Sequence, residues 1–419
     1  MRVEVLKRDK RYEIDKSTQY GIQTYGTAND YPQNVIEIVN ASVTGSGCVK
    51  RYGEFINGKG FLDEELGKMR ANGRKETFNT LLSLVSGDYA RFGGFALLVN
   101  YNANYRISSI YHVPFENVRL GLPNDQGICT NYAIHTDWGK RNTRLRRFSV
   151  EDIVRVDAFN PDADVVAEQV ALSGGFECYK GQLYYYTNNG AWSYPLPCYD
   201  AALTDMNTEE GISNITNRNA RNNFLPSGML IDICYQDQTN DDETATEQLL
   251  KQYQGDANAL KLMYAQVASK EEIPQFVEFK TQNYDKEYTE SRNATKDNIG
   301  RAFNQPPILR AELTSSGFST TEMVSAYNYY NSVTINERNR VSSAFDLLLS
   351  YWWIEGEYDA TIDALSYDVE MTLADKLGNN LSALLDVISN VQLTALDKRG
   401  ICRTIFGLSE DEINQILHI

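Results

Sequence analysis

The chain has 419 residues, which is long enough for two or three packed units or for one protein built from several subdomains. Its 40 Lys and Arg residues against 56 Asp and Glu residues give a formal net charge of -16, which excludes the broadly basic surface of a protein that grips nucleic acid tightly. An apolar fraction of 42% and 27 tyrosines predict a folded globular chain rather than a disordered acidic one.

The cysteines predict neither a disulfide framework nor a zinc site, because none of them forms a CxxC pair or a related spacing. We expect reduced, mostly structural thiols in a cytoplasmic setting. The N-terminal residues lack an apolar segment of signal-peptide length, and no run of about 18 apolar residues occurs, so neither export nor a membrane span is predicted. The six cysteines are Cys48, Cys129, Cys178, Cys198, Cys234 and Cys402.

Residues 1–197 are predicted to form an α+β unit. Apolar residues recur at helical spacing in YPQNVIEIVNASVTGSGCVKRYGEF, residues 31–55, and a second helix is predicted over 63–93. Two β-rich runs, Phe95–Tyr101 and Tyr105–Val113, are joined by an Asn-rich turn and predict a hairpin. Further strands are predicted in YAIHTDW, EDIVRVDAF and GQLYYYTNNGAWSYPL.

The segment 198–230 predicts a long helix with few apolar residues. A helix this polar cannot be buried all round, so it either bridges solvent or packs along a narrow stripe against copies of itself. Its end leads into a strand, GMLIDICY. The apolar residues of the helix are Ala202, Leu203, Met206, Ile212 and Ile215.

The segment 231–286 is predicted to be a compact acidic α/β insertion. It combines the strand GMLIDICY with a short helix, TATEQLLKQYQG, and a second strand, PQFVEFKTQ. Residues 231–290 hold thirteen acidic side chains against five lysines, so half of the chain's negative excess lies here.

A second polar helix over 287–304 must end at Pro306 and Pro307, because proline lacks a backbone N–H and moves the preceding residue out of the α region. A Ser-rich loop follows, after which Thr320 or Thr321 can cap the next helix. That helix is predicted to run without a break to about residue 353. Its buried stripe is predicted to contain Val341, Phe345, Leu348 and Trp352.

The remainder is predicted to return to a sheet within EGEYDATIDALSYDVE and then to end in helices over 371–419. Thr394 precedes Asp397 by three residues, and Ser409 precedes Glu412 by three, so both pairs have the spacing of a capping box. Gly407 between them is expected to end the first of these helices.

No catalytic motif is complete in the sequence. The three histidines, His112, His135 and His418, form no HExxH or HxH pattern, and GxSxG, the P-loop and a strand-linked GxGxxG are missing. The glycine pairs at 45–47 and 58–60 are expected in loops. The acidic run 241–243 leaves a paired-acid hydrolase open, although a solvated surface is the favoured interpretation.

A basic cluster and a tyrosine run each have two interpretations. The cluster KRNTRLRR could contact phosphate or an acidic partner, but a solvated loop that balances an acidic chain is favoured. Tyr184–Tyr186 could stack on bases, but packing within a sheet is favoured. The basic residues are Lys140, Arg141, Arg144, Arg146 and Arg147.

The order of these elements resembles the phage portal protein family of tailed bacteriophages, of the HK97-like type. A long polar helix, a small α/β insertion and a polar helix ending in GRAFNQPPIL are followed by a Ser-rich loop and a long helix. FGGFALLVNYNANYRISSIYHVPFENVRL also resembles the portal wing. The residues that match at the corner are Ile299, Ala302, Phe303, Pro306, Pro307, Ile308 and Leu309, with Ser319, Thr320, Thr321 and Glu322 opening the next helix.

The resemblance implies an α+β fold with a mixed α/β wing, stem helices, a clip and a helical crown. The implied wing is 1–197, with 321–370 as a long helix that returns to it. The implied stem helices are 198–230 and 287–304. The implied clip is 231–286, the tunnel loop 305–320 and the crown-like end 371–419.

The implied function is a non-enzymatic ring, expected to be a dodecamer, that forms the channel for DNA packaging and ejection at one capsid vertex. Its partners would be further copies of itself, the large terminase subunit, a head-completion or adaptor protein, the major capsid protein and double-stranded DNA that passes without sequence specificity. Neither a cofactor, nor a metal, nor a membrane is implied. The protein would be found in the virion, and in the host cytoplasm during assembly.

The resemblance also implies roles for individual residues. The residues expected to face DNA in the tunnel loop are Asn304, Gln305, Arg310, Thr314, Ser315 and Ser316. Those expected to shape the loop are Phe303, Pro306, Pro307 and Gly317. The clip would dock the motor and adaptor through Asp237, Asp241, Asp242, Glu243 and Glu247, and the basic cluster would face the capsid or DNA. Two alternatives stay open: a metal-dependent hydrolase or nuclease with an acidic site, and a head–tail connector without a tunnel loop.

Overall fold

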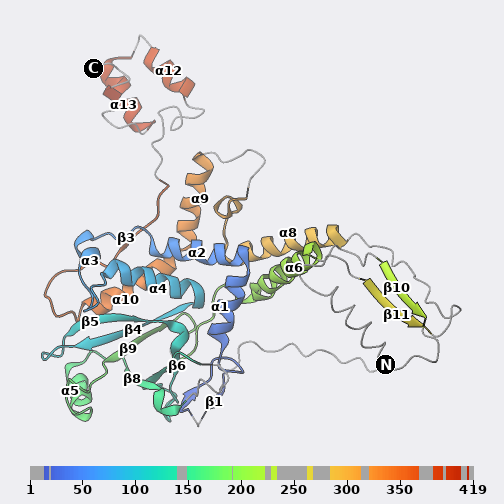
Figure 1. Ribbon diagram of the computed structural model, residues 1–419. Helices are drawn as coiled ribbons and strands as arrows, with labels where there is room; N and C mark the ends of the chain where they lie inside the picture. Colours follow the sequence, from blue (N-terminus) through green and yellow to red (C-terminus); the bar gives the residue numbers. More distant parts are fainter. Residues whose placement is uncertain are drawn as a thin grey trace. The chain divides into compact units, whose positions relative to one another are not determined.

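The computed structural model confirms the α+β class (Figure 1). The chain divides into two compact units. The first comprises Met1–Pro306 and Val333–Ala364, and the second comprises Pro307–Ser332 and Leu365–Ile419. The structure describes residues 14–17, 20–138, 149–190, 192–221, 228–233, 262–267, 284–312, 320–367, 381–389, 393–406 and 413–414.

The first unit begins with helices that differ from the prediction in two places, and the first is that the helical run predicted over 31–55 is two helices. α1 (Tyr31–Ala41) and α2 (Val43–Asn57) meet at Ser42, whose side chain caps α2 by accepting from the Gly45 N–H. One continuous helix over 63–93 was the wrong prediction. The structure has α3 (Glu64–Lys68) and α4 (Phe78–Phe92), because Met69 becomes extended and Ala71 N–H bonds Glu76 O across a turn.

The main sheet has six strands in the order β5-β4-β9-β8-β7-β6. β4 (Gly94–Tyr101) pairs antiparallel with β5 (Ile107–Val113), which confirms the hairpin, although β5 begins later than predicted because Tyr105 takes a φ of 56° in the turn. The pair β8–β9 is parallel, and the others are antiparallel. The remaining strands are β6 (Val118–Leu120), β7 (Asn131–Ile134), β8 (Val154–Ala158) and β9 (Gln182–Thr187).

Short elements surround this sheet. β1 (Lys16–Ser17) pairs with β2 (Ile22–Gln23), and α5 (Ala163–Leu172) connects β8 to β9. Three 3-10 turns are η1 (Phe115–Asn117), η2 (Val150–Asp152) and η3 (Asp200–Ala202).

The long helix predicted from Thr321 to about residue 353 is two helices. α9 (Thr320–Val333) and α10 (Ile335–Leu349) are separated at Thr334, which is buried and accepts a 2.8 Å hydrogen bond from Arg338 Nη1. The predicted stripe is nevertheless correct. Its four residues, Val341, Phe345, Leu348 and Trp352, are all buried, and Phe78 packs edge-on against both Phe345 and Trp352.

The predicted return to a sheet is confirmed in a separate two-stranded sheet. β12 (Ile362–Asp363) pairs antiparallel with β3 (Gly60–Phe61). A strand near the C-terminal end of the first unit therefore pairs with a strand about 300 residues earlier in the sequence.

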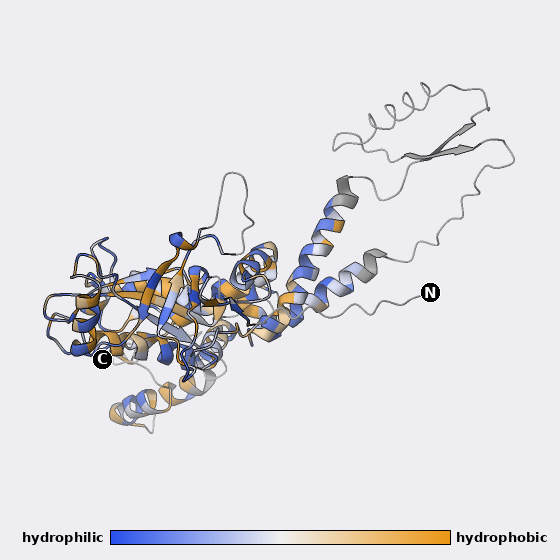
Figure 2. Cartoon of the chain, turned by 90° about the horizontal axis from the view of Figure 1, so that it is seen from below, coloured by the Kyte–Doolittle hydropathy of each residue, from blue (hydrophilic) through white to orange (hydrophobic). Residues whose placement is uncertain are grey.

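Two polar helices, α6 (Leu203–Arg221) and α8 (Tyr284–Ala302), lie side by side and form an arm of the first unit (Figures 1 and 2). Beyond them β10 (Gly228–Ile233) pairs in parallel with β11 (Leu262–Val267). β10 confirms the strand GMLIDICY, whereas β11 was not predicted. The predicted helix TATEQLLKQYQG and strand PQFVEFKTQ lie outside the described residues.

The second unit contains η5 (Pro307–Arg310), α9, α12 (Leu381–Ser389) and α13 (Ala395–Thr404). The capping box of Thr394 and Asp397 is confirmed, with both reciprocal hydrogen bonds present. The second box, Ser409 with Glu412, lies outside the described residues. Leu384, Cys402 and Ile413 form a small buried cluster in this unit.

Candidate functional site

The corner after α8 ends the helix as the double proline requires, two residues earlier than predicted. Asn304 takes a left-handed φ of 50°, Asn304 N–H bonds Arg301 O at 3.0 Å, and Gln305 N–H bonds Gly300 O at 3.0 Å. This pair of bonds is a Schellman motif, and asparagine is the residue besides glycine that most readily takes its left-handed position.

A second motif of the same kind follows at once. After the 3-10 turn η5, Ala311 has a φ of 59°, Ala311 N–H bonds Ile308 O at 3.2 Å, and Glu312 N–H bonds Pro307 O at 3.1 Å. Alanine carries a Cβ that disfavours this conformation. Two successive helical turns thus each end at a residue with positive φ, and the second of these residues, Ala311, holds backbone strain.

Phe303 fixes the end of α8 to the first unit. Its buried ring stacks on Tyr199 with a centroid distance of 4.8 Å and meets Tyr52 edge-on at 5.9 Å. Tyr199 in turn donates to Arg91 O at 2.6 Å. The predicted loop-shaping residue therefore anchors the helix from which the loop departs.

The residues expected to face DNA differ in exposure. Asn304 is exposed, but Gln305 is 5% exposed and neither of its amide atoms has a hydrogen-bond partner among the described residues. The Arg310 side chain is 9% exposed and donates to Glu312 at 3.1 Å. Thr314, Ser315, Ser316 and Gly317 lie outside the described residues. The DNA-facing roles of all six residues stay predictions.

A buried carboxylate joins the arm to the body. Glu209 on α6 accepts from the Ser42 hydroxyl, from Thr44 Oγ1 at 2.7 Å and from Thr44 N–H at 3.2 Å. These groups form the N-terminus of α2, where the helix dipole favours a negative charge. An acidic side chain of the arm therefore caps a helix of the body.

α6 approaches α2 closely at this point because Gly45 has no side chain. A Cβ on Gly45 would lie 2.7 Å from Met206 Sδ. The expectation that the glycines at 45–47 lie in a loop was wrong, since both belong to α2. Of the pair at 58–60, Gly58 does lie in a turn, with a φ of 58°, whereas Gly60, with a φ of 108°, begins β3.

Stacked tyrosines hold the base of the arm. Tyr25 stacks between Tyr31 and Tyr194, with centroid distances of 5.0 and 4.0 Å, and Tyr31 donates to Asp200 at 2.5 Å. Burial, followed by the hydrogen bond to Asp200, raises the pKa of Tyr31 above its ordinary value. The hydroxyl therefore stays a donor throughout the physiological range.

Arg119 lies beside this tyrosine stack and is fully buried. Its five N–H donors bond Asn29 Oδ1, Asn29 O, Gln33 Oε1, Glu116 O and Val118 O at 2.7 to 3.1 Å. Its guanidinium also lies over the rings of Tyr25 and Trp138. Burial lowers the pKa of Arg119. Its hydrogen bonds all go to neutral oxygens, and these oxygens stabilise the positive charge of the guanidinium.

The ionisable groups of the first unit include one close histidine pair. His112 Nε2 lies 2.7 Å from Asp88 Oδ2, which also accepts from Phe115 N–H at 3.2 Å. Within the described residues no group of three or more His, Cys, Asp or Glu side chains could hold a metal ion. In the same residues no helix has the length and apolar character to cross a membrane.

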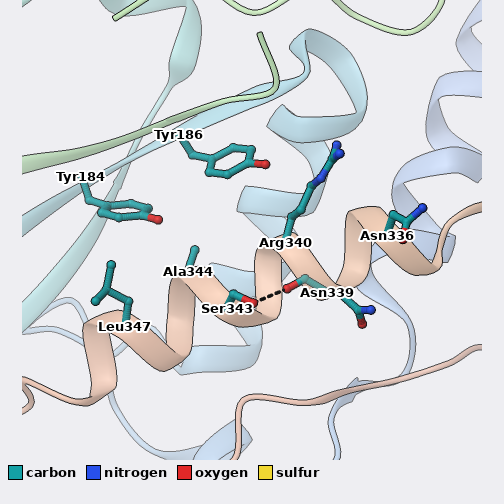
Figure 3. Close-up of a pocket in the computed structure, with 8 residues that line it drawn as sticks. All are labelled: Tyr184, Tyr186, Asn336, Asn339, Arg340, Ser343, Ala344 and Leu347. Carbon is teal, nitrogen blue, oxygen red and sulfur yellow. Dashed lines mark hydrogen bonds between the residues drawn. The ribbon is translucent and has the colours of Figure 1, made fainter. Parts of the chain in front are cut away.

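An open groove of about 490 Å³ lies between β9 and α10 (Figure 3). Tyr184 and Tyr186 form its wall on the sheet, while Tyr185 points to the other face and stacks on Phe115 and Tyr132. The favoured interpretation of the tyrosine run as sheet packing is confirmed for all three residues, since Tyr184 and Tyr186 pack against Phe95 of β4 on the groove face. The groove itself was missed, although the alternation along a strand predicts that two of the three tyrosines share a face. Its lining residues are Tyr184, Tyr186, Asn336, Asn339, Arg340, Ser343, Ala344 and Leu347.

Two predicted surfaces lie outside the described residues. One is the clip docking surface of Asp237, Asp241, Asp242, Glu243 and Glu247, and the other is the basic cluster of Lys140, Arg141, Arg144, Arg146 and Arg147. The described residues of the predicted stem belong to the first unit, in which Glu209, Phe303 and Arg119 are buried.

The fold defines an α+β protein with a polar two-helix arm. No family model matches the chain, and no curated protein matches it. Among solved structures, it is similar to a chain from the neck of an empty gene transfer agent particle with C6 symmetry, at 16% identity and a TM-score of 0.45, with 90% of this chain and 94% of that chain covered.

Two other solved chains are similar over the same shares of both chains. One comes from the neck of a native gene transfer agent particle with C12 symmetry, at 16% identity and a TM-score of 0.44. The other comes from the virion of the native particle, at 15% identity and a TM-score of 0.43. Likeness at this level leaves the function to be inferred from the chain's own residues.

Proposed function

We propose that the chain is a portal subunit, copies of which form a ring at one capsid vertex. Double-stranded DNA passes through the ring during packaging and ejection. A separate terminase motor moves the DNA, and the ring docks the major capsid protein on one side and head-completion or adaptor proteins on the other. In this proposal the chain supplies a scaffold and carries out no reaction itself.

The polar arm is the observation that carries the proposal. α6 and α8 have 19 residues each, or about 28 Å of helix. All residues of 213–217 and of 289–294 are exposed. Because each run is longer than one helical turn, every face of both helices is exposed there.

Because these turns of α6 and α8 are exposed on every face, no other part of the same chain packs against them among the described residues. By contrast, the apolar residues Leu203, Met206 and Ile212 are buried within the subunit, so they are not available to pack copies together. Ile215 is exposed. Neighbouring copies in a closed ring provide partners for the exposed turns on their flanks and leave a polar face toward a central channel.

The charge distribution supports a conduit. The exposed run 213–217 carries no charge, the exposed run 289–294 carries one glutamate and one arginine and so no net charge, and the whole chain is strongly acidic. DNA that must slide through a channel is not held by such a wall, since neutral or negative surfaces make no ion pairs with phosphate. The residue order GRAFNQPPIL at the corner, with the resemblance it carries, supports the same proposal.

Light scattering combined with negative-stain imaging of the purified protein tests the ring. Closed rings with a central hole and on the order of ten or more subunits are expected. A chain that stays monomeric over the accessible concentration range, and also in the presence of the capsid protein, contradicts the proposal.

The tunnel-loop role is tested separately in a packaging assay. Deleting 315–317 is expected to leave ring formation intact and to impair DNA packaging. Normal packaging by rings of the deletion variant contradicts the role proposed for this loop.

A further inference from the structure

The groove between β9 and α10 presents polar groups that the subunit does not use. Within the described part of the chain, the hydroxyls of Tyr184 and Tyr186 and the side-chain amides of Asn336 and Asn339 make no hydrogen bond. Ser343 donates to the backbone oxygen of Asn339, as Figure 3 shows. Convergent polar groups without partners, over an aromatic wall, are typical of a surface that binds something.

The two ends of the groove differ in chemistry (Figure 3). Arg340 lies at the Tyr186 end, is exposed, and uses Nη1 to donate to Tyr89 at 3.3 Å. Leu347, which is also exposed, lies at the Tyr184 end. An occupant therefore needs an apolar group at one end and an acceptor, preferably a carboxylate, at the other.

One exposed segment of the first unit has this combination. The tip after α5, residues 172–178, carries Leu172, which is 81% exposed, and Phe176, which is 41% exposed, followed by the exposed carboxylate of Glu177. Phe176 keeps this exposure although its ring stacks on Tyr105 with a centroid distance of 6.0 Å, and large apolar side chains this exposed indicate an interaction surface.

The tip is held in one shape by its own backbone. Gly175 N–H bonds Val170 O at 2.9 Å and Cys178 N–H bonds Gly175 O at 3.1 Å. Gly174 and Gly175 have φ values of 87° and 115°, which strain any residue except glycine. A rigid tip loses little entropy when it docks.

We propose that the α5 tip of one copy inserts into the β9–α10 groove of the next copy in the ring. Leu172 and Phe176 then cover the Tyr184 and Leu347 end, and Glu177 pairs with Arg340. The inference rests on the proposed ring, and it names the contact that closes it. Because tip and groove are different surfaces of one chain, the contact is heterologous, which is the type that generates rings.

Disulfide crosslinking tests the contact directly. Cys178 on the tip is exposed, and Ser343 is exposed in the groove. In assembled Ser343→Cys protein, a mild thiol oxidant is expected to produce a ladder of covalent oligomers on a non-reducing gel. Two controls are expected to give no ladder: Ser343→Cys combined with Cys178→Ser, and Ser350→Cys, which places the thiol on exposed Ser350 outside the groove.

The outcomes separate this inference from the proposed function. Rings that form without a ladder in the Ser343→Cys protein overturn the tip-to-groove contact and leave the portal proposal standing. A crosslink confined to single chains overturns the contact as well. Failure of the wild-type protein to form rings overturns the proposed function and this inference with it.

Charge reversal provides a second measurement. Glu177→Arg and Arg340→Glu are each expected to lower the fraction of protein in rings about tenfold, and the double variant is expected to recover most of it. Lys50→Glu, at an exposed position on α2, changes the net charge by the same amount as Arg340→Glu and serves as control. Equal ring fractions in Glu177→Arg and wild type refute the contact, and this variant breaks no described hydrogen bond within the subunit.

Discussion

Replacing Glu209 by glutamine tests whether the buried carboxylate holds the arm to the body. Its three hydrogen bonds converge on the first turn of α2, from Ser42, Thr44 Oγ1 and Thr44 N–H. Glutamine keeps one carbonyl oxygen but removes the charge and points an amide donor at a cluster of donors. A hydrogen bond to a charged group contributes about 1.5–3 kcal/mol, and a carboxylate at a partly buried helix N-terminus up to about 2 kcal/mol.

Because the remaining oxygen retains part of these interactions, we expect the variant to lose about 2 kcal/mol of local stability. Amide hydrogen exchange of the segment 42–57 reports this loss as an increase in exchange rate. At 1.4 kcal/mol per factor of ten, the expected acceleration is about thirtyfold. Segments of the six-stranded sheet should change little, since they do not contact Glu209.

The neighbouring residue supplies the matched control. Glu210 is half-buried on the same helix and makes no described hydrogen bond, so Glu210→Gln removes the same charge without touching α2. If exchange in 42–57 is accelerated equally by both substitutions, the loss comes from the net charge of α6, and the capping role of Glu209 is refuted.

Three further changes test other described features. Arg119→Met should cost about 3–5 kcal/mol in urea unfolding because five buried acceptors lose their donor, whereas Arg106→Met at an exposed site should cost little. Burial raises the pKa of Glu116 above 4.5, so Glu116→Gln should raise the melting temperature near pH 7 and lose that advantage as the pH falls to about 4.5. Ala311→Gly should stabilise the corner by about 0.5–1 kcal/mol in thermal unfolding by relieving the positive φ, while Ala294→Gly inside α8 should destabilise by about 1 kcal/mol.

Each of these has a result that would contradict it. Equal costs at Arg119 and Arg106 would mean that the buried guanidinium contributes no more than an exposed one. For Glu116, the sign follows because the folded state holds the proton more tightly than the unfolded state, so wild-type stability must fall as the pH rises through the raised pKa. A pH-independent difference would exclude that linkage. Destabilisation by glycine at Ala311 would show that its backbone is not strained.

Sequence patterns predicted the elements whose causes are local. Proline chemistry places the end of α8, the three-residue spacing of Thr394 and Asp397 gives the capping box, and two β-rich runs around an Asn-rich turn give the hairpin. In each case the interacting groups lie within a few residues of one another, so a short stretch of sequence contains all the information.

The patterns failed where distant partners decide the structure. The break at Thr334 depends on Arg338, which also donates to Phe55 O at 3.0 Å, 283 residues away in sequence. Glu209 caps a helix that begins 166 positions earlier, so nothing in α6 itself marks that carboxylate as buried. Arg119 resembles any strand arginine until the loop at Asn29 surrounds it. The β9–α10 groove is formed by elements about 150 residues apart in the sequence, so a periodic pattern within either element does not predict it.

The hydrogen bond from Arg338 to Phe55 and the pairing of β12 with β3 also determine when the first unit can finish folding during synthesis. The first unit cannot be completed until residues near 364 have left the ribosome, which takes tens of seconds after α2 emerges at typical elongation rates of about 5–20 residues per second. During that delay α2 and β3 lack their final partners. In the proposed ring, the β9–α10 groove does not exist until α10 has been synthesised, so a nascent chain cannot bind a neighbouring tip there before that point.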